Sequence, residues 1–158
     1  SRSVREVKHE ATLKRLKESE QLFADTIQKN EKAVAAQIEK IHAEESSPLH
    51  YNKEDSLRSV IKLAYYTYRD HYLQWEELPA GSGYADIVYI PRKYSDMPLL
   101  IIELKKDDTP ENAIKQIRKR NYAAPYEDMD VDILLIGVAY DSNDPEKTHR
   151  CVIEEYER

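Results

Sequence analysis

A glutamate and a lysine stand two residues apart at the end of an apolar run. Residues 99 to 102 are Leu-Leu-Ile-Ile, and Glu103, Leu104 and Lys105 follow. A strand has a period of two residues, so Glu103 and Lys105 project from one face and Leu104 from the other. Charged groups are rarely buried unless they are paired or bound to a metal. Either the strand has reached solvent here, which the tripeptide alone favours, or the pair belongs to a site.

A second isolated acid precedes this pair in the chain. Asp86 lies among the apolar and aromatic residues 84 to 90, and 17 residues separate it from Glu103. That separation allows two adjacent strands and a connection, so the two carboxylates can face one point. Together they can hold a hard cation such as Mg²⁺, which prefers oxygen ligands and assists chemistry at phosphate. Lys105 would then position a water or stabilise the transition state. The alternative is that Asp86 caps the backbone of a hairpin turn.

A basic cluster follows the strand. It consists of Lys115, Arg118, Lys119 and Arg120. A helix would place Lys115 and Lys119 on one side, where they could contact a phosphate backbone. A solvated helix face is the more frequent explanation of such a charge run.

The overall charge qualifies any reading as a nucleic-acid protein. The 158 residues carry a formal net charge of −6, which argues mildly against tight, non-specific binding of a polyanion. Residues 53 to 126, however, hold 12 basic and 11 acidic side chains, so the acidity lies in the flanks. Nucleic acid therefore remains a permissible partner.

The composition indicates one main soluble domain. Hydrophobic residues make up 41% and charged residues 34% of the chain. No apolar run approaches the roughly 20 residues of a membrane span, and residues 1 to 10 are too charged for a secretory signal, so we expect a cytoplasmic protein. Cys151 is the single cysteine and is expected to be buried as a small apolar side chain. The five histidines show no metal-ligand spacing: His71 is expected near the core, and His9, His42, His50 and His149 at the periphery.

The N-terminal quarter reads as helical. Apolar positions recur at three- to five-residue spacing from residue 4 to residue 27, which predicts a long amphipathic helix. Asn30 can cap a second helix through about residue 43. Residues 46 to 51, with Pro48, break this pattern. We therefore predict a helical appendage or linker over residues 1 to 45 and a main domain over residues 46 to 158.

The main domain alternates helices and strands in the order αβββαββ. A helix is predicted from residue 55 to about residue 72, with Tyr65, Tyr68 and Tyr72 on its core face rather than as a platform for stacking bases. Strands are predicted over residues 73 to 79, 84 to 90, 99 to 105, 131 to 140 and 150 to 156, with a hairpin loop at residues 80 to 83. Thr109 and Pro110 open a helix that should run to about residue 122.

Several segments resemble one known family in order and spacing. They are Tyr51-Asn52-Lys53-Glu54-Asp55-Ser56-Leu57, Leu63-Ala64-Tyr65-Tyr66 with Arg69-Asp70, Glu77-Leu78-Pro79-Ala80-Gly81, Gly83-Tyr84-Ala85-Asp86, Ile90-Pro91-Arg92, Ile102-Glu103-Leu104-Lys105 and Ala113-Ile114-Lys115-Gln116-Ile117. This set resembles the PD-(D/E)XK phosphodiesterase superfamily and, more narrowly, the bacterial PD-(D/E)XK domain found behind an AAA-type ATPase module. The resemblance covers about residues 20 to 156. Lys106 departs from it, because an aromatic residue is common there in the relatives.

The resemblance implies a restriction-endonuclease-like α/β fold with a mixed central sheet flanked by helices. It also implies that Asp86 and Glu103 bind Mg²⁺ or Mn²⁺ with the carbonyl of Leu104, and that Lys105 is catalytic. Glu54 would complete the metal site from the first core helix, and Gln116 would orient Lys105 or the attacking water. Glu54 could instead serve only as a first-turn acid that favours the helix dipole.

Two functions follow as expectations. The first is metal-dependent hydrolysis of phosphodiester bonds in nucleic acid, with DNA expected over RNA. The second is a weak or silent nuclease-like domain that serves as a binding or assembly module for an AAA-type ATPase in the same full-length chain. No phosphate-binding Gly-rich loop of such an ATPase is present here. The amphipathic residues 3 to 43 fit three partners equally: the main domain, a second copy in a homo-oligomer, or the missing module.

Overall fold

The computed structural model describes residues 2–76, 79–80, 83–84 and 86–158, and the side chains of residues 54, 79–80 and 83–84 lie outside that description. The helices are α1 (Val4–Ile27), α2 (Glu31–Glu45), α3 (Glu54–Ala64) and α4 (Pro110–Lys119), with 3-10 turns η1 (Tyr66–Asp70) and η2 (Ala124–Tyr126). The strands are β1 (Tyr72–Glu76), β2 (Pro79–Ala80), β3 (Gly83–Tyr84), β4 (Ile87–Pro91), β5 (Leu99–Lys106), β6 (Ile133–Tyr140) and β7 (His149–Glu155).

Five strands form one mixed sheet in the order β1-β4-β5-β6-β7. The pairs β1/β4, β4/β5 and β6/β7 are antiparallel, whereas β5 and β6 run parallel. A parallel pair needs a crossover connection, and α4 with η2 supplies it between β5 and β6. The predicted α/β fold, with a mixed sheet flanked by helices, is confirmed.

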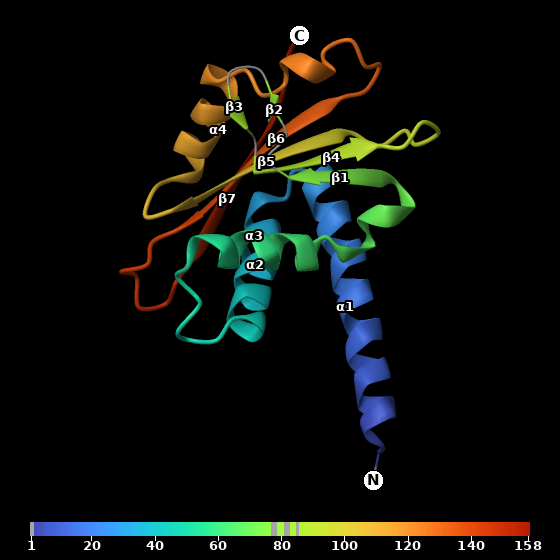
Figure 1. The fold of residues 1–158 in the computed structure, drawn as a ribbon, viewed down its shortest axis with the longest axis vertical. Helices are drawn as coiled ribbons and strands as arrows, with labels where there is room; N and C mark the ends of the chain where they lie inside the picture. Colours follow the sequence, from blue (N-terminus) through green and yellow to red (C-terminus); the bar gives the residue numbers. More distant parts are fainter. Residues whose placement is uncertain (1, 77–78, 81–82, 85) are drawn as a thin grey trace.

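Helices cover both faces of the sheet. Figure 1 shows α1, α2 and α3 on one side and α4 on the other. The strands supply a separate apolar cluster to each side: Leu100 and Ile102 of β5 pack with the first group, and Leu99 and Ile101 pack with α4. The two-residue period of β5 therefore divides its side chains between two cores.

The N-terminal helices are joined closely to the sheet. Val34 and Ile38 of α2 are buried in the same apolar cluster as the residues of β5 to β7. Two acids of α2 also bind main-chain groups of the edge strand β7: Glu39 Oε1 accepts from the N–H of His149 and Glu31 Oε2 from that of Ile153, each at 2.7 Å. An exposed strand edge invites pairing with another chain, and α2 covers this one. The division at residue 45 stays a prediction.

Two expectations about elements were wrong. The helix expected to reach residue 72 ends at Ala64, and Tyr68 and Tyr72 lie in η1 and β1. Tyr65 and Tyr72 are nevertheless fully buried in one core. The spacing of the tyrosines therefore indicated correctly that Tyr65 and Tyr72 are buried, but not that they lie on one continuous helix. The helix expected to reach residue 122 ends at Lys119, and Asn121 has a φ of 54°, outside helical geometry.

Two histidines expected at the periphery are buried. His42 is 0% and His149 is 4% exposed, and His42 Nδ1 lies 2.8 Å from His149 Nε2. His71, expected near the core, is exposed. Cys151 is buried as predicted. Among the described residues, no helix is both long and apolar enough to span a bilayer.

Candidate active site

The end of β5 presents its charged residues to α4. Leu99 and Ile101 face the apolar side of α4, and Glu103 and Lys105 continue the same alternation. Leu104 points the other way and packs against the cluster beneath α1 to α3. The sequence prediction that Glu103 and Lys105 share a face, opposite Leu104, agrees with this arrangement.

Gln116 lies between the two charges and contacts both. Its Nε2 donates to Glu103 Oε1 and its Oε1 accepts from Lys105 Nζ, each at 2.5 Å. Lys105 Nζ is 3.8 Å from Glu103 Oε1. Gln116 Nε2 also lies 3.3 Å from the hydroxyl of Tyr122. One amide on α4 thus fixes the positions of an acid and a base on β5.

A glycine on the next strand permits this contact. Gly137 of β6 is the register partner of Glu103, and it lies directly under the first turn of α4. A Cβ at Gly137 would collide with the main-chain oxygen of Pro110 and stand 3.0 Å from the Cβ of Ala113. The close approach of α4 to the sheet, which brings Gln116 within reach of Glu103, therefore depends on a residue without a side chain.

Asp86 lies beside Glu103 at the start of β4. Ile87 pairs with Ile102, so Asp86 comes one step further along, at the level of Glu103. Its Oδ2 accepts from the main-chain N–H of Leu104 at 2.8 Å, where a strand carbonyl would otherwise bind. The hairpin backbone that Asp86 would cap in the alternative role includes residues 81 and 82, which lie outside the described residues, so that alternative stays open.

Arg58 is a site residue that the sequence reasoning missed. Its Nη2 donates to Asp86 Oδ1 at 3.1 Å, and its side chain is 20% exposed. Arg58 stands one helical turn after Glu54, the first residue of α3. That spacing was the available signal. The side chain of Glu54 itself lies outside the described residues.

Burial dominates the electrostatics of Glu103. The residue is 4% exposed, and this desolvation, aided by the nearby negative charge of Asp86, raises the pKa of its carboxyl to about 8. The positive charge of Lys105 opposes the shift but is the smaller effect. Within the described part of the chain, Glu103 Oε2 is a buried oxygen with no hydrogen-bond partner. A buried acceptor without a partner is costly, so this oxygen calls for a proton or a cation.

One protein-family model matches the part of the chain that contains this arrangement. The model of the PD-(D/E)XK nuclease superfamily matches residues 52–150, which include both strand acids, Lys105 and Gln116. The chain belongs to the PD-(D/E)XK nuclease superfamily. No curated protein proved similar to it.

The residues of this PD-(D/E)XK site fit a divalent metal in chemistry. Members of the superfamily typically bind such an ion. Glu103 offers an oxygen without a partner, and Asp86 stands beside it, so the donor set is the one that Mg²⁺ or Mn²⁺ prefers. Across residues 2–76, 79–80, 83–84 and 86–158, no three His, Cys, Asp or Glu side chains are gathered as ligands. The third predicted carboxylate, that of Glu54, is not among the side chains described.

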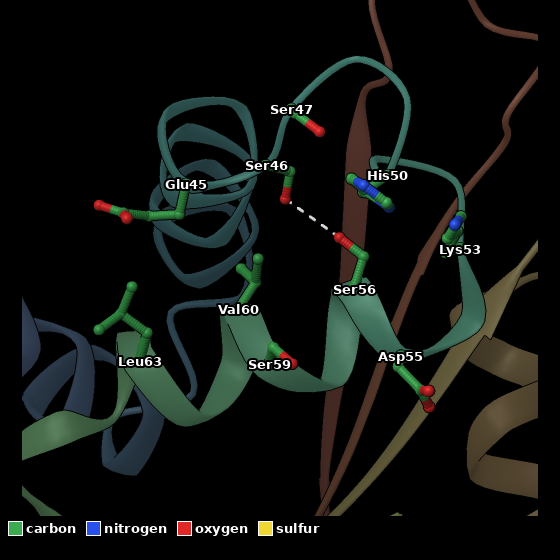
Figure 2. A pocket seen from close by; sticks show the side chains of 10 residues that line it. All are labelled: Glu45, Ser46, Ser47, His50, Lys53, Asp55, Ser56, Ser59, Val60 and Leu63. Atoms are coloured by element: carbon green, nitrogen blue, oxygen red, sulfur yellow. Dashed lines mark hydrogen bonds between the residues drawn. The ribbon is translucent and has the colours of Figure 1, made fainter.

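A pocket larger than those beside Lys105 lies elsewhere on the PD-(D/E)XK chain. It measures about 570 Å³ and is formed by the end of α2, the following loop and α3. Figure 2 shows that Glu45 and Asp55 point away from its centre and that the interaction drawn is a hydrogen bond of 3.0 Å between Ser46 and Ser56. No buried acid faces this pocket among the described residues that line it. Its size therefore gives no reason to move the candidate site from β5.

The basic cluster of α4 divides into two groups. Lys115 and Lys119 line a pocket together with Lys105 and Gln116. Arg118 instead reaches toward β7, where its Nη2 lies 3.3 Å from Glu154 Oε1. The predicted nucleic-acid contact by Lys115, Arg118 and Lys119 thus has two members beside the site and one directed away from it.

Proposed function

We propose that the chain is a metal-dependent nuclease that hydrolyses phosphodiester bonds in nucleic acid, with DNA as the expected substrate. The observation that supports this proposal is the hydrogen-bonded group of Glu103, Gln116 and Lys105 next to Asp86, within the residues that match a superfamily of nucleases. Asp86, Glu103 and the carbonyl of Leu104 would hold Mg²⁺ or Mn²⁺, with Glu54 as a further ligand. When bound, the ion supplies charge that offsets the negative charge developing on a phosphoryl oxygen.

The other steps belong to the side chains of this protein. The ammonium of Lys105, held by Gln116 at 2.5 Å, would donate hydrogen bonds to the attacking water and to the phosphoryl group. Gln116 accepts from Lys105 and donates to Glu103, so it would hold the two side chains in fixed positions. Glu103 must lose its proton before it can act as a ligand, because a ligating carboxylate is ionised.

A direct test begins with the metal. Calorimetry with Mn²⁺ should show binding to the wild type and none to the Asp86→Ala/Glu103→Ala variant. The Asp128→Ala/Asp130→Ala variant removes two exposed acids and should bind as the wild type does. Cleavage of labelled DNA in Mn²⁺ should then disappear in Lys105→Ala while the melting temperature is retained. Unchanged turnover in that variant would remove Lys105 from the mechanism.

A second function is favoured by one specific contact. Arg58 already neutralises Asp86 at 3.1 Å, and Glu103 holds a proton more firmly than an ordinary carboxylate does. Both features oppose metal binding. They would suit a domain with a weak or silent site that serves as an assembly module for an AAA-type ATPase. Absence of Mn²⁺ binding to the wild type would favour this function over the nuclease.

A further inference from the structure

Two pockets flank Lys105, and basic side chains dominate both. The α3 pocket, of about 310 Å³, is lined by Lys53, Arg58, Lys105 and Lys106 with Asp86 as its acid. The α4 pocket, of about 400 Å³, is lined by Lys105, Lys115, Lys119 and Arg120 with Asp108 as its acid. Among the described residues that line them, each pocket thus has four cations against one acid, in a chain whose net charge is −6. Lys105 belongs to both.

Several of these cations are not engaged by acids of the protein. Within the described residues, Lys53, Lys115 and Lys119 form no ion pair, and Lys106 Nζ donates to the main-chain oxygen of Asn52 at 2.9 Å. The last contact keeps the Lys106 charge at the α3 pocket without cancelling it. Some basic residues elsewhere on the surface are paired with nearby glutamates, namely Arg15, Lys29, Lys40, Lys62 and Arg118, whereas Lys8 and Lys32 have no ion pair among the described residues.

The spacing within the α4 pocket suits a repeating anion. Lys115 and Lys119 stand one helical turn apart, so their side chains leave α4 on the same side about 6 Å from each other. Gln116, between them in sequence, turns inward to Lys105. A chain of phosphates that follows α4 would therefore arrive at Lys105.

We propose that the phosphodiester backbone of the substrate crosses the site at Lys105, with the phosphates before and after that point in the α3 and α4 pockets. The proposal rests on the proposed function for the catalytic role of Lys105. The binding path itself is argued only from the two pockets. It also explains how a protein with a negative net charge can bind a polyanion. The positive charge is concentrated in the α3 and α4 pockets, and the rest of the surface carries the negative charge.

Salt-dependent binding tests the path without any cleavage. The probes are a fluorescein-labelled 16-nucleotide single strand and the corresponding duplex, as DNA and as RNA, in buffer with EDTA. Binding is followed by anisotropy across a range of KCl concentrations. The variants Lys53→Gln/Lys106→Gln and Lys115→Gln/Lys119→Gln should each weaken binding and flatten the slope of log K against log salt, by about 0.7 per lost contact on a single strand and about 0.9 on a duplex.

The control is Lys8→Gln/Lys32→Gln, which makes the same change in net charge at exposed lysines on α1 and α2. It should leave the slope unchanged. Because Lys106 bonds to Asn52, Lys53→Arg/Lys106→Arg serves as a second variant that keeps the charge and should restore binding. Equal weakening by the control, or an unchanged slope in either pocket variant, would overturn the path.

The two proposals fail in different ways. Binding that depends on both pockets, with no cleavage in Mg²⁺ or Mn²⁺, would remove the nuclease activity and keep the path. Cleavage in Mg²⁺ or Mn²⁺ that neither pocket variant slows would keep the nuclease activity and remove the path.

Discussion

The buried proton of Glu103 gives the sharpest test of the site. The pKa of the Glu103 carboxyl is about 8 in the folded protein, against 4.5 for an ordinary glutamate carboxyl. Glu103 therefore binds its proton more tightly when the chain is folded. The stabilisation is therefore complete below pH 4.5 and is lost as the pH rises through 8. Between these limits the free energy of unfolding falls by up to about 1.4 kcal/mol per pH unit. From pH 5.5 to pH 7.5 this amounts to about 2 to 3 kcal/mol.

The variant Glu103→Gln isolates that effect, because its amide is neutral at every pH and can still accept from Gln116. Urea unfolding in EDTA at half-unit steps from pH 5 to pH 9 should show the stability of the variant, relative to the wild type, rising by about 2 to 3 kcal/mol between pH 5.5 and 7.5. Other titrating groups are common to both proteins and cancel in the difference. Glu154→Gln, at a half-buried acid on β7, is the control and should not reproduce this trend. A difference that stays constant with pH would refute the raised pKa.

Three further predictions concern the surrounding fold. Gly137→Ala should destabilise the protein by about 1 to 3 kcal/mol in urea unfolding, because the new methyl group overpacks the strand under α4. Burial lowers the pKa of His42 to about 4, so its own contribution to stability should fall as the pH drops from 6.5 to 5, and the stability of His42→Gln relative to the wild type should rise over that range in urea unfolding. A reversed slope would mean that the hydrogen-bonded pair of His42 and His149 retains an extra proton. Tyr65→Phe should cost about 1 kcal/mol in thermal unfolding, since it deprives Thr26 of a buried hydroxyl partner 2.8 Å away.

The spacing of apolar residues along the sequence predicted the features that depend on neighbouring residues, namely single helices and strands. The helix over residues 4 to 27 was predicted with the bounds of α1, although only its second half, around Leu22 and Phe23, is buried. The apolar run at residues 99 to 105 predicted β5, and the period of two residues placed Glu103 and Lys105 on one face. The family resemblance added Gln116, whose contact with Lys105 no spacing rule could give.

Long-range pairings explain the predictions that were wrong. His42 and His149 are 107 residues apart, and each is buried only because α2 packs on β7. His42 follows Ile38 by four residues and shares its face of α2, but this spacing does not identify His149 as the partner. Arg58 was not predicted as a site residue for a similar reason. Its partner Asp86 follows 28 residues later, next to a strand whose position relative to α3 depends on the whole sheet.

The site also depends on residues that carry no functional group. Glu103 and Lys105 would point at α4 in any sheet with this strand, but Gln116 reaches them only if α4 lies close to β6. Gly137 removes the side chain that would hold α4 away, at the strand position in register with Glu103. The same approach buries Glu103, and burial is the largest cause of its raised pKa. Gly137→Ala should therefore act on the site as well as on stability: as α4 moves outward and water enters, the pKa of Glu103 should return toward its ordinary value.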